Sequence, residues 1–424
     1  MSGLQKSLGG AVGTFLALST ILGSGMMILP GTSYHTLSRS AWMPWAVAAL
    51  AVVPLLYCYA WLGRRHPSAS GVAHYAEVAF NPSLARTAGT AATLALVAGI
   101  PATALTGGRY LAEFTGVSAL AWLFPVLALC GATAVACAGT TVSGRLQVAL
   151  VLALFAMVVC IALVGLGSHG VRAPGTDLPA SGSFGTVLTA VFVAFTGWET
   201  VAFTFEEHKR PDAIPRIFAA SYLIVVALYG LLLLSLFATV DPHEDGLRSA
   251  PLLLLAERSL GELGRPVTLV LVTAAITANV FASVLALSRL VFGMARSGYL
   301  PVRLVRVRER DGNPLTAVVS VGALLTLITV LSASGVVPLE RLFTFSGGVY
   351  FVLYGVGAAA FARLATGGPA RAVTLLCAVT VVGVTVLAGP SMWLCWALFG
   401  VLALAIALLR RRTVHEDSRE SVRN

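Results

Sequence analysis

Two short runs of residues interrupt long apolar segments, and their types suit the binding of a small charged molecule. Gly23, Ser24 and Gly25 lie inside the first apolar segment, although each glycine costs roughly 1 kcal/mol relative to alanine in a helix. A helix that breaks there frees backbone N–H groups at the start of its second half, and the positive end of that half-helix favours a carboxylate. Packing of two helices through small residues is the alternative explanation of this motif.

The second run, residues 195–199, ends in an acidic residue. Glu199 lies well inside an apolar stretch from Val187 to Phe205. An ionised carboxylate at the centre of a bilayer costs about 2.5–3.5 kcal/mol even on the scale that gives the lowest values. A buried carboxyl group that gains and loses a proton is a candidate proton relay, so we predict proton coupling at Glu199. A structural glutamate hydrogen-bonded to a neighbouring helix is the alternative.

The composition indicates that both runs lie in a membrane protein. Hydrophobic residues make up 57% of the 424 residues and charged residues 11%, and the mean hydropathy is +0.87. Soluble domains have about 25% charged residues, whereas a bilayer surrounds a protein with apolar solvent. The six cysteines fall in apolar runs and form no Cys-x-x-Cys pair, so we expect neither a disulfide nor a metal, and no cofactor.

Apolar runs of roughly 20 residues, the length that spans a bilayer, recur along the chain. They predict an all-α polytopic membrane protein of about twelve transmembrane helices. The predicted helices cover residues 10–31, 41–63, 86–113, 119–139, 144–167, 183–205, 216–240, 266–293, 314–333, 338–361, 372–388 and 390–410. We assign residues 1–410 to a single transmembrane domain and residues 411–424 to a polar tail. Residues 250–260 are expected to form a short amphipathic helix on the outer face.

The distribution of basic residues predicts the orientation of these helices. With the N-terminus in the cytoplasm and alternating crossings, 21 of the 28 basic residues fall on the inner side and seven on the outer side. Such a bias marks the cytoplasmic side, and it places both termini in the cytoplasm. The cluster from Arg303 to Arg310 is then a loop near anionic lipid. We expect no nucleic-acid partner despite the net charge of +10.

The two interrupted helices are the first and the sixth of the predicted set. Matching breaks in two halves of a chain are typical of an inverted repeat whose binding site lies between the repeats near the bilayer midplane. We therefore predict a 5+5 inverted repeat, with residues 1–167 and 183–361 as its halves and with helices 1 and 6 unwound. Residues 372–410 would form two further helices.

Charged residues and prolines also gather in two predicted inner loops, residues 64–75 and 206–216. These segments are candidate parts of an inner gate. Charged loops of this kind are common at the cytoplasmic face of membrane proteins, so we interpret them as ordinary loops.

Taken together, these residues resemble transporters of the amino acid–polyamine–organocation (APC) superfamily over nearly the whole chain. The run Gly23–Gly25 is similar to the unwound segment of helix 1 in that family, which has a LeuT-like fold. Helix 6 of the family and the loop after it are similar to Thr196–Glu199, Glu206, Glu207, Lys209 and Pro211. The end of the family's helix 8 is similar to Ser288–Arg289, Met294–Arg296 and Leu300–Pro301. Residues Met1–Leu4 and Pro67–Tyr75 are most similar to a bacterial branch that exports L-methionine and branched-chain amino acids.

The resemblance implies an amino-acid site at the two breaks. The substrate carboxylate would bind the backbone amides of Ser24 and Gly25, and the ammonium group would bind carbonyl groups near Ile21 and in residues 195–197. Glu199 matches an acid implicated in proton coupling in relatives, whereas Met26 and Trp198 differ from the residues usual at their positions. The predicted substrate-binding residues are Ile21, Gly23, Ser24, Gly25, Met26, Phe195, Thr196, Gly197 and Trp198.

The side chains available around these breaks indicate the class of substrate. They are apolar: Ile21, Met26, Val193, Ala194, Phe195 and Trp198. A polyamine or arginine substrate needs an acidic or aromatic site for its cation. We therefore predict secondary active transport of small neutral amino acids of the Leu, Ile, Val and Met class.

Direction and coupling ion are less constrained by the sequence. We favour proton-coupled export across the plasma (bacterial inner) membrane, with proton- or sodium-coupled uptake or exchange as the alternative. A sodium ion would pair helix-1 carbonyl groups with Asn279 and Ser283. A homodimer is left open. No HExxH, GxSxG or P-loop motif occurs in the chain, and we expect no enzymatic activity.

Overall fold

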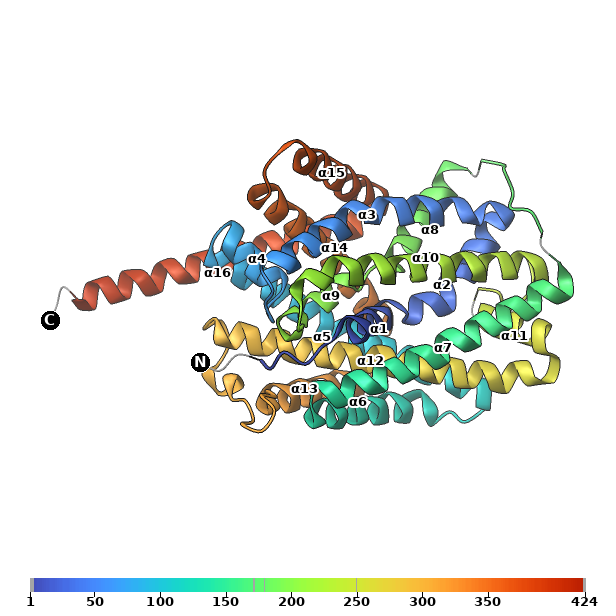
Figure 1. Cartoon of the computed structure of the whole chain (residues 1–424), viewed down its shortest axis with the longest axis horizontal. Helices are drawn as coiled ribbons and strands as arrows, with labels where there is room; N and C mark the ends of the chain where they lie inside the picture. Colours follow the sequence, from blue (N-terminus) through green and yellow to red (C-terminus); the bar gives the residue numbers. More distant parts are fainter. Residues whose placement is uncertain (1–3, 171, 179, 249, 422–424) are drawn as a thin grey trace.

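In the computed structural model, α-helices and short 3-10 turns form the regular secondary structure of the described residues, which are 4–170, 172–178, 180–248 and 250–421 (Figure 1). One isolated parallel β-bridge joins Leu8 to His208. The predicted all-α class is confirmed. Residues 1–3, with most of the segment Met1–Leu4, and residues 422–424 of the predicted tail lie outside the described part of the chain.

Each predicted membrane segment coincides with helical structure, and the first and sixth fall on two helices each. The first is divided into α1 (Gly10–Ile21) and α2 (Ser24–Leu37), and the sixth into α8 (Ser181–Val193) and α9 (Trp198–Ala202). The other helices are α3 (Trp42–Arg65), α4 (Val72–Ala79), α5 (Pro82–Thr115), α6 (Leu120–Ala138), α7 (Thr140–His169), α10 (Ile214–Thr239), α11 (Pro251–Leu260), α12 (Gly264–Arg296), α13 (Leu315–Ala333), α14 (Leu339–Leu364), α15 (Gly368–Ala388) and α16 (Pro390–Ser421). The short helix expected near residues 250–260 is α11.

The lengths and surfaces of these helices identify a multi-pass membrane protein. Within the described residues, nine helical stretches are long and apolar enough to cross a membrane, and three shorter apolar helices accompany them. Large apolar side chains such as Leu50, Leu127, Leu223 and Val401 are exposed on the outside of the bundle. Extended apolar surface of this kind is rare on soluble monomers, and a bilayer covers it. The exact number of crossings stays a prediction.

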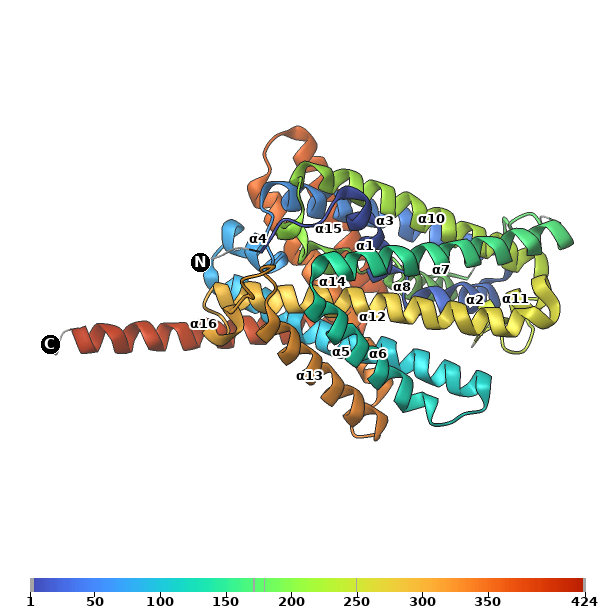
Figure 2. The same ribbon diagram turned by 60° about the horizontal axis from the view of Figure 1, so that its bottom comes forward.

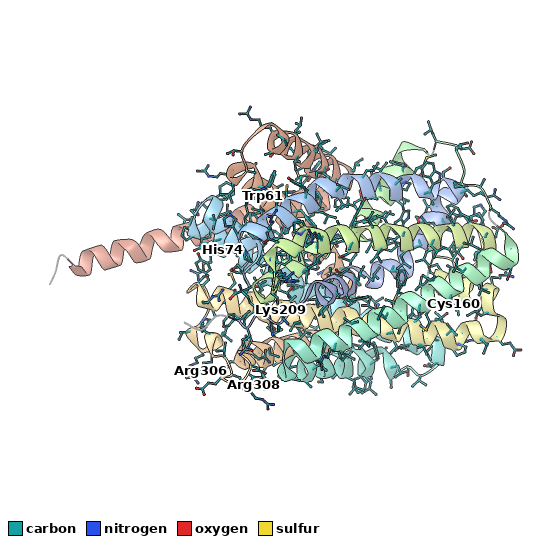
Figure 3. All side chains as sticks on the ribbon, viewed as in Figure 1. Trp61, His74, Cys160, Lys209, Arg306 and Arg308 are labelled. Atoms are coloured by element: carbon teal, nitrogen blue, oxygen red, sulfur yellow. The ribbon has the colours of Figure 1, made fainter. Side chains whose placement is uncertain are left out.

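The long helices run side by side along the bundle, and both chain ends lie at the same end of it (Figures 1 and 2). Arg306 and Arg308 of the basic cluster lie at that end together with His74, whereas Cys160 lies toward the opposite end (Figure 3). The end that carries the termini is called the inner end below. The α16 helix continues past the bundle to Ser421 (Figure 1).

The four half-helices lie in the interior of the bundle. The α1 helix contacts α7, α10 and α12, and α2 contacts α8, α10 and α11. The short α9 helix lies against α1, α3, α12 and α14. Because longer helices surround the broken segments, their irregular backbone is shielded from lipid, which is the condition under which such backbone is stable in a membrane.

Candidate functional site

The two helix breaks are in direct contact near the middle of the bundle. Gly197 has φ +114°, in the left-handed region that favours glycine. A Cβ atom at Gly197 would lie 2.8 Å from the carbonyl oxygen of Thr20, and one at Gly25 would lie 3.5 Å from the Cα atom of Ala194. The absence of a side chain at position 197 therefore allows the backbones of the two breaks to approach each other.

The first break is a tight turn formed by Leu22 and Gly23. The N–H of Leu22 donates to the carbonyl of Leu18 at 2.8 Å, and the N–H of Gly23 donates to the carbonyl of Ile21 at 2.9 Å. The α2 helix starts immediately afterwards at Ser24. Since the first N–H groups of a helix have no partner within it, the start of α2 presents backbone donors at the break.

Glu199 caps the second break from within its own half-helix. Both of its carboxylate oxygens accept the N–H of Gly197, each at 3.1 Å, and its side chain is fully buried. Tyr350 and Tyr354 of α14 lie within electrostatic range of the carboxylate. A negative group at this position is stabilised by the N-terminal end of α9. The carboxylate thus caps its own helix, and the Tyr354 hydroxyl of the neighbouring α14 interacts with the same group.

A cavity of about 120 Å³ lies where the breaks meet. Its walls come from both breaks and from α5, α12 and α14. The lining residues are Thr20, Ile21, Gly23, Gly25, Gly99, Ile100, Thr103, Ala194, Thr196, Gly197, Thr200, Asn279, Ser283, Phe343, Ser346, Gly347 and Tyr350. Within the described part of the chain, this lining contains hydroxyl and amide groups but no acidic residue, lysine, arginine or histidine.

Seven residues selected from the sequence lie together in this lining. They are Ile21, Gly23, Gly25, Thr196 and Gly197 from the predicted substrate site, and Asn279 and Ser283 from the candidate ion site. Ser24 is the first residue of α2, and its backbone lies between two lining glycines. The side chain of Asn279 faces the first break, because a Cβ atom at Gly23 would lie 2.9 Å from its Nδ2.

The other residues expected in the substrate site, Met26, Phe195 and Trp198, are buried and do not line this cavity. Phe195 packs edge-on against Tyr229, with ring centroids 5.6 Å apart. Trp198 packs against Phe218, with ring centroids 5.4 Å apart. These aromatic side chains hold the second break against neighbouring helices.

The walls contributed by α5 and α14 were missed at the level of sequence. Gly99, Ile100 and Thr103 come from α5, and Phe343, Ser346, Gly347 and Tyr350 come from α14. The hydroxyl of Ser346 donates to the carbonyl of Ala95 at 2.8 Å and joins these two helices. The available signal was a run of small residues inside each apolar helix, at Gly99 and at Ser346–Gly348.

A second cavity of about 430 Å³ adjoins the first and is apolar. The two share Gly25, Thr196, Phe343 and Gly347. The remaining walls are formed by α2, α8, α14, α15 and the start of α16, through Ile28, Leu29, Thr189, Ala190, Phe192, Gly348, Phe351, Val384, Ala388 and Met392. The α2 and α8 helices extend from the breaks away from the inner end (Figure 1), so this cavity lies on the outer side of the first.

The inner end is closed by a buried ion pair. Arg289 of α12 and Glu207 are both nearly inaccessible, and Nε of Arg289 donates to Oε1 of Glu207 at 2.6 Å. Asn313, in the loop before α13, accepts from Nη2 of Arg289 at 3.1 Å and donates to the carbonyl of Ala136 at 2.8 Å. Residues 206–216 thus include a buried contact with α12, and a role for this segment in a gate stays a prediction. Its pairing was hidden because the partner, Arg289, lies 82 positions away in the sequence.

A second ion pair extends this closure to the N-terminal segment. Arg296 binds both carboxylate oxygens of Glu206, at 2.6 and 2.5 Å. The same carboxylate accepts the N–H of Ala69 at 3.0 Å and that of Leu4 at 3.4 Å. Burial acts to raise the pKa of Glu206, but Arg296 and the two N–H groups together lower that pKa below its usual value. Glu206 is therefore held in its charged form.

His208 lies beside these pairs, packed against α1. Its ring contacts Gly13, where a Cβ atom would overlap the imidazole. Its backbone forms the bridge with Leu8, in which the N–H of Lys209 donates to the carbonyl of Leu8 at 3.0 Å. Burial lowers the pKa of His208 to about 4, so the ring is neutral at physiological pH.

The chain matches the family model described as amino acid permease over residues 13–409. It therefore belongs to the amino acid permease family of the APC superfamily. The family consists of transporters, so the protein is an amino acid transporter of the membrane and not an enzyme.

Individual relatives are about a quarter identical to the chain over the residues that align. It is 26% identical over 344 residues, 80% of each chain, to an uncharacterized amino acid permease YecA of Bacillus subtilis. It is 28% identical over 249 residues to the L-methionine/branched-chain amino acid exporter YjeH of Escherichia coli, covering 54% of this chain and 55% of that one. The serine/threonine exchanger SteT of Bacillus subtilis is 25% identical over 71% of this chain and 70% of its own.

The fold has a counterpart among solved structures. The crystal structure of MhsT in complex with L-phenylalanine superposes with a TM-score of 0.64 and 13% identity, over 92% of this chain and all of that one. At this low identity the likeness shows the fold alone, which is LeuT-like. In the present chain the first and sixth membrane segments are interrupted.

Proposed function

We propose that the protein transports neutral amino acids with apolar side chains, of the Leu, Ile, Val and Met class. The observation that carries this proposal is the pair of adjoining cavities at the helix breaks. One presents backbone polar groups, and the other is apolar. A zwitterion with an apolar side chain matches this division.

The polar cavity suits the two charged groups of an amino acid. The carboxylate would bind the N–H groups of Ser24 and Gly25, where the start of α2 adds the positive end of its dipole. The ammonium group would bind carbonyl groups of residues 195–197. The carbonyl of Ile21 already accepts the N–H of Gly23, but a carbonyl oxygen has a second lone pair, so it remains available to the same ammonium group.

The apolar cavity would take the substrate side chain. Thr196 and Phe343 line both cavities, so a side chain that leaves the polar cavity between them enters apolar surroundings. A lysine or arginine side chain would lose hydration there without an acidic partner among the described lining residues, which is costly. Similarity to the exporter YjeH supports the same class of substrate and the outward direction.

We further propose that protons drive the transport, that Glu199 is the coupling group, and that the protein works in the bacterial plasma membrane with both termini in the cytoplasm. The burial of Glu199 beside the second break supports this role. Protonation would remove the negative charge that caps α9, and it would thereby weaken the hydrogen bonds between Glu199 and the N–H of Gly197, the residue that lies against α1. Uptake or exchange by the same site is the alternative, because the direction follows the gradients.

Flux through proteoliposomes tests the substrate class and the direction. Vesicles loaded with radiolabelled leucine or methionine should release the label faster when the pH gradient drives exchange against protons. Unlabelled isoleucine and valine should compete for transport, whereas arginine and lysine should not. Strong competition by arginine would contradict the proposed substrate class, and flux that requires sodium would contradict proton coupling.

The variant Glu199→Gln distinguishes a role of Glu199 in proton coupling from its structural role as the cap of α9. Glutamine keeps an oxygen that accepts the N–H of Gly197 but cannot titrate. We expect leucine counterflow, which needs no net proton movement, to persist within about threefold, the effect of roughly one neutral hydrogen bond. Leucine flux driven by a pH gradient should be lost. Unchanged dependence on the gradient would leave Glu199 with the structural role alone.

A further inference from the structure

The carbonyl groups at the end of α1 have a complete set of hydrogen-bond donors. The last four carbonyl groups of a helix lack partners within it, and they carry the negative end of the helix dipole. Here the carbonyl of Leu18 accepts the N–H of Leu22, and that of Ile21 accepts the N–H of Gly23. The two between them, of Ser19 and Thr20, accept the same side-chain amide from another helix.

That amide belongs to Asn279 of α12. Its Nδ2 lies 2.9 Å from the carbonyl oxygen of Ser19 and 3.0 Å from that of Thr20. An amide nitrogen carries two hydrogens, so a single side chain satisfies both carbonyl groups. The opposite orientation of the amide would place its oxygen against two carbonyl oxygens, which is unfavourable. The hydrogen bonds therefore define which way the amide points.

The position of this amide is the one that a cation would otherwise occupy. Two carbonyl oxygens at the negative end of a helix, buried in a low dielectric, attract positive charge strongly. The nitrogen of Asn279 meets both oxygens and presents the partial positive charge of its hydrogens to them. A sodium ion at the same carbonyl groups would have to displace this nitrogen.

We propose that Asn279 is an uncharged substitute for a cation at the first helix break, and that it makes substrate binding independent of sodium. It is a positioning residue, because it holds the end of α1 against α12 while Gly23 and the start of α2 face the substrate. Close packing of Gly23 on the amide ties its position to the backbone donors at Ser24 and Gly25. This proposal rests on the proposed function only where an amino acid is used as the probe.

Substrate binding in different salts tests the proposal. Leucine affinity of the purified wild-type protein should be equal within about twofold in sodium chloride, potassium chloride and choline chloride of equal ionic strength. Asn279→Ala removes both donors, and leucine affinity should fall about tenfold or more in every salt. Asn279→Asp puts a carboxylate beside the two carbonyl groups, so its leucine affinity should be low in choline and should be restored by sodium. Restoration by sodium is a response that a merely structural role would not produce.

Asn313→Asp is the matched control. Asn313 is also buried and donates to two carbonyl groups at a helix end, those of Ala136 and Cys137, but it lies at the inner end away from the cavity. Since Asn313 also accepts from Arg289, the carboxylate of Asn313→Asp would face a cation that is already present, and leucine binding by this variant should show no sodium response. The same sodium response in both variants would contradict the specific role of Asn279.

A further readout does not depend on the substrate. The Tm of the wild type should not change between sodium and choline, whereas that of Asn279→Asp should rise with sodium. A wild-type protein whose leucine affinity rises tenfold with sodium, or whose Tm rises with sodium, would overturn the proposal, since the amide would then turn its oxygen to an ion. Failure of leucine to bind in any salt would instead count against the proposed substrate class, and the Tm measurements would still decide the role of Asn279.

Discussion

At the scale of single residues, Gly197 determines how the two breaks meet. Its backbone is left-handed, and the carbonyl of Thr20 occupies the space that a side chain would need. Any other residue at position 197 has to push α1 away from α9. Because this contact forms one wall of the polar cavity, a change at Gly197 acts on the site itself and not only on stability.

Gly197→Ala should therefore reduce both stability and transport. A left-handed conformation costs about 1–2 kcal/mol for a residue with a Cβ atom, and the overlap with Thr20 adds to that cost. We expect a lower Tm and a loss of leucine flux. Gly230→Ala in α10 is the control, since a Cβ atom there meets nothing within 4 Å, and it should raise stability by about 0.5–1 kcal/mol. Equal effects of the two variants would contradict the role given to Gly197.

His208 predicts how stability responds to acid. Burial holds its pKa at about 4 in the folded protein, whereas an unfolded chain has a histidine pKa of about 6.5. Between these values the unfolded state binds a proton that the folded state does not, so stability falls as the pH is lowered from about 6.5 to about 4. His208→Gln should flatten the dependence of Tm on pH in this window. The exposed His243 is the control, and His243→Gln should leave the wild-type dependence in place.

The residues of the site were predictable from the sequence where their type is unusual for an apolar helix. Gly23, Gly25 and Gly197 are poor residues for an apolar helix, and each of them lines the cavity. The placement of Phe195 and Trp198 was not predictable, because a helix that is apolar on all sides gives no stripe from which to read its rotation. An aromatic residue beside a break can therefore face either the cavity or a neighbouring helix.

At the scale of elements, the inner end is held by side chains that connect segments far apart in the sequence. The pair Arg289–Glu207 joins α12 to the turn after α9, and Asn313 extends the connection to α6. Sequence reasoning named residues 206–216 as a candidate part of a gate, favoured an ordinary loop, and could not pair Glu207 with Arg289, since partners separated by tens of residues leave no local pattern. The length of the apolar runs, which is a local property of the sequence, was sufficient to locate every helix used by the site.

Glu207→Gln should destabilise the protein strongly. Removing one charge of a buried pair leaves the other uncompensated, which typically costs about 3–5 kcal/mol. The exposed pair of Arg64 and Asp212 is the control, and Asp212→Asn should change stability by about 0–1 kcal/mol. Thermal unfolding in detergent measures both. Similar Tm values for the two variants would show that Arg289 finds a different partner.

At the scale of the whole molecule, the two ends of the bundle differ in how they close. The inner end is tied by two buried or half-buried ion pairs, whereas the polar cavity adjoins an apolar cavity on its outer side. From this asymmetry we expect the site to be reached from the outer side while the inner side is shut. The sequence predicted which helices break, but the state of the two ends depends on contacts between all of the helices and could not be read from it.

Labelling of single cysteines should detect this asymmetry. In a background without the six native cysteines, Thr189→Cys lines the apolar cavity and should react with a membrane-impermeant thiol reagent added outside intact cells. Leucine should slow the reaction. Ser297→Cys, at the exposed inner end of α12, should react only after the membrane is permeabilised. Reaction of both positions from the same side would contradict the proposed access.

The contacts of residues 4–9 have a practical consequence for work with the protein. The N–H of Leu4 binds Glu206, and Leu8 pairs with the backbone of residues 207–209, so this segment lies within the closed inner end. An affinity tag or fluorescent fusion joined just before it would compete for the same space and bias the balance between conformations. The far end of α16 projects clear of the bundle (Figure 1), so we expect a fusion there to disturb the transport cycle less.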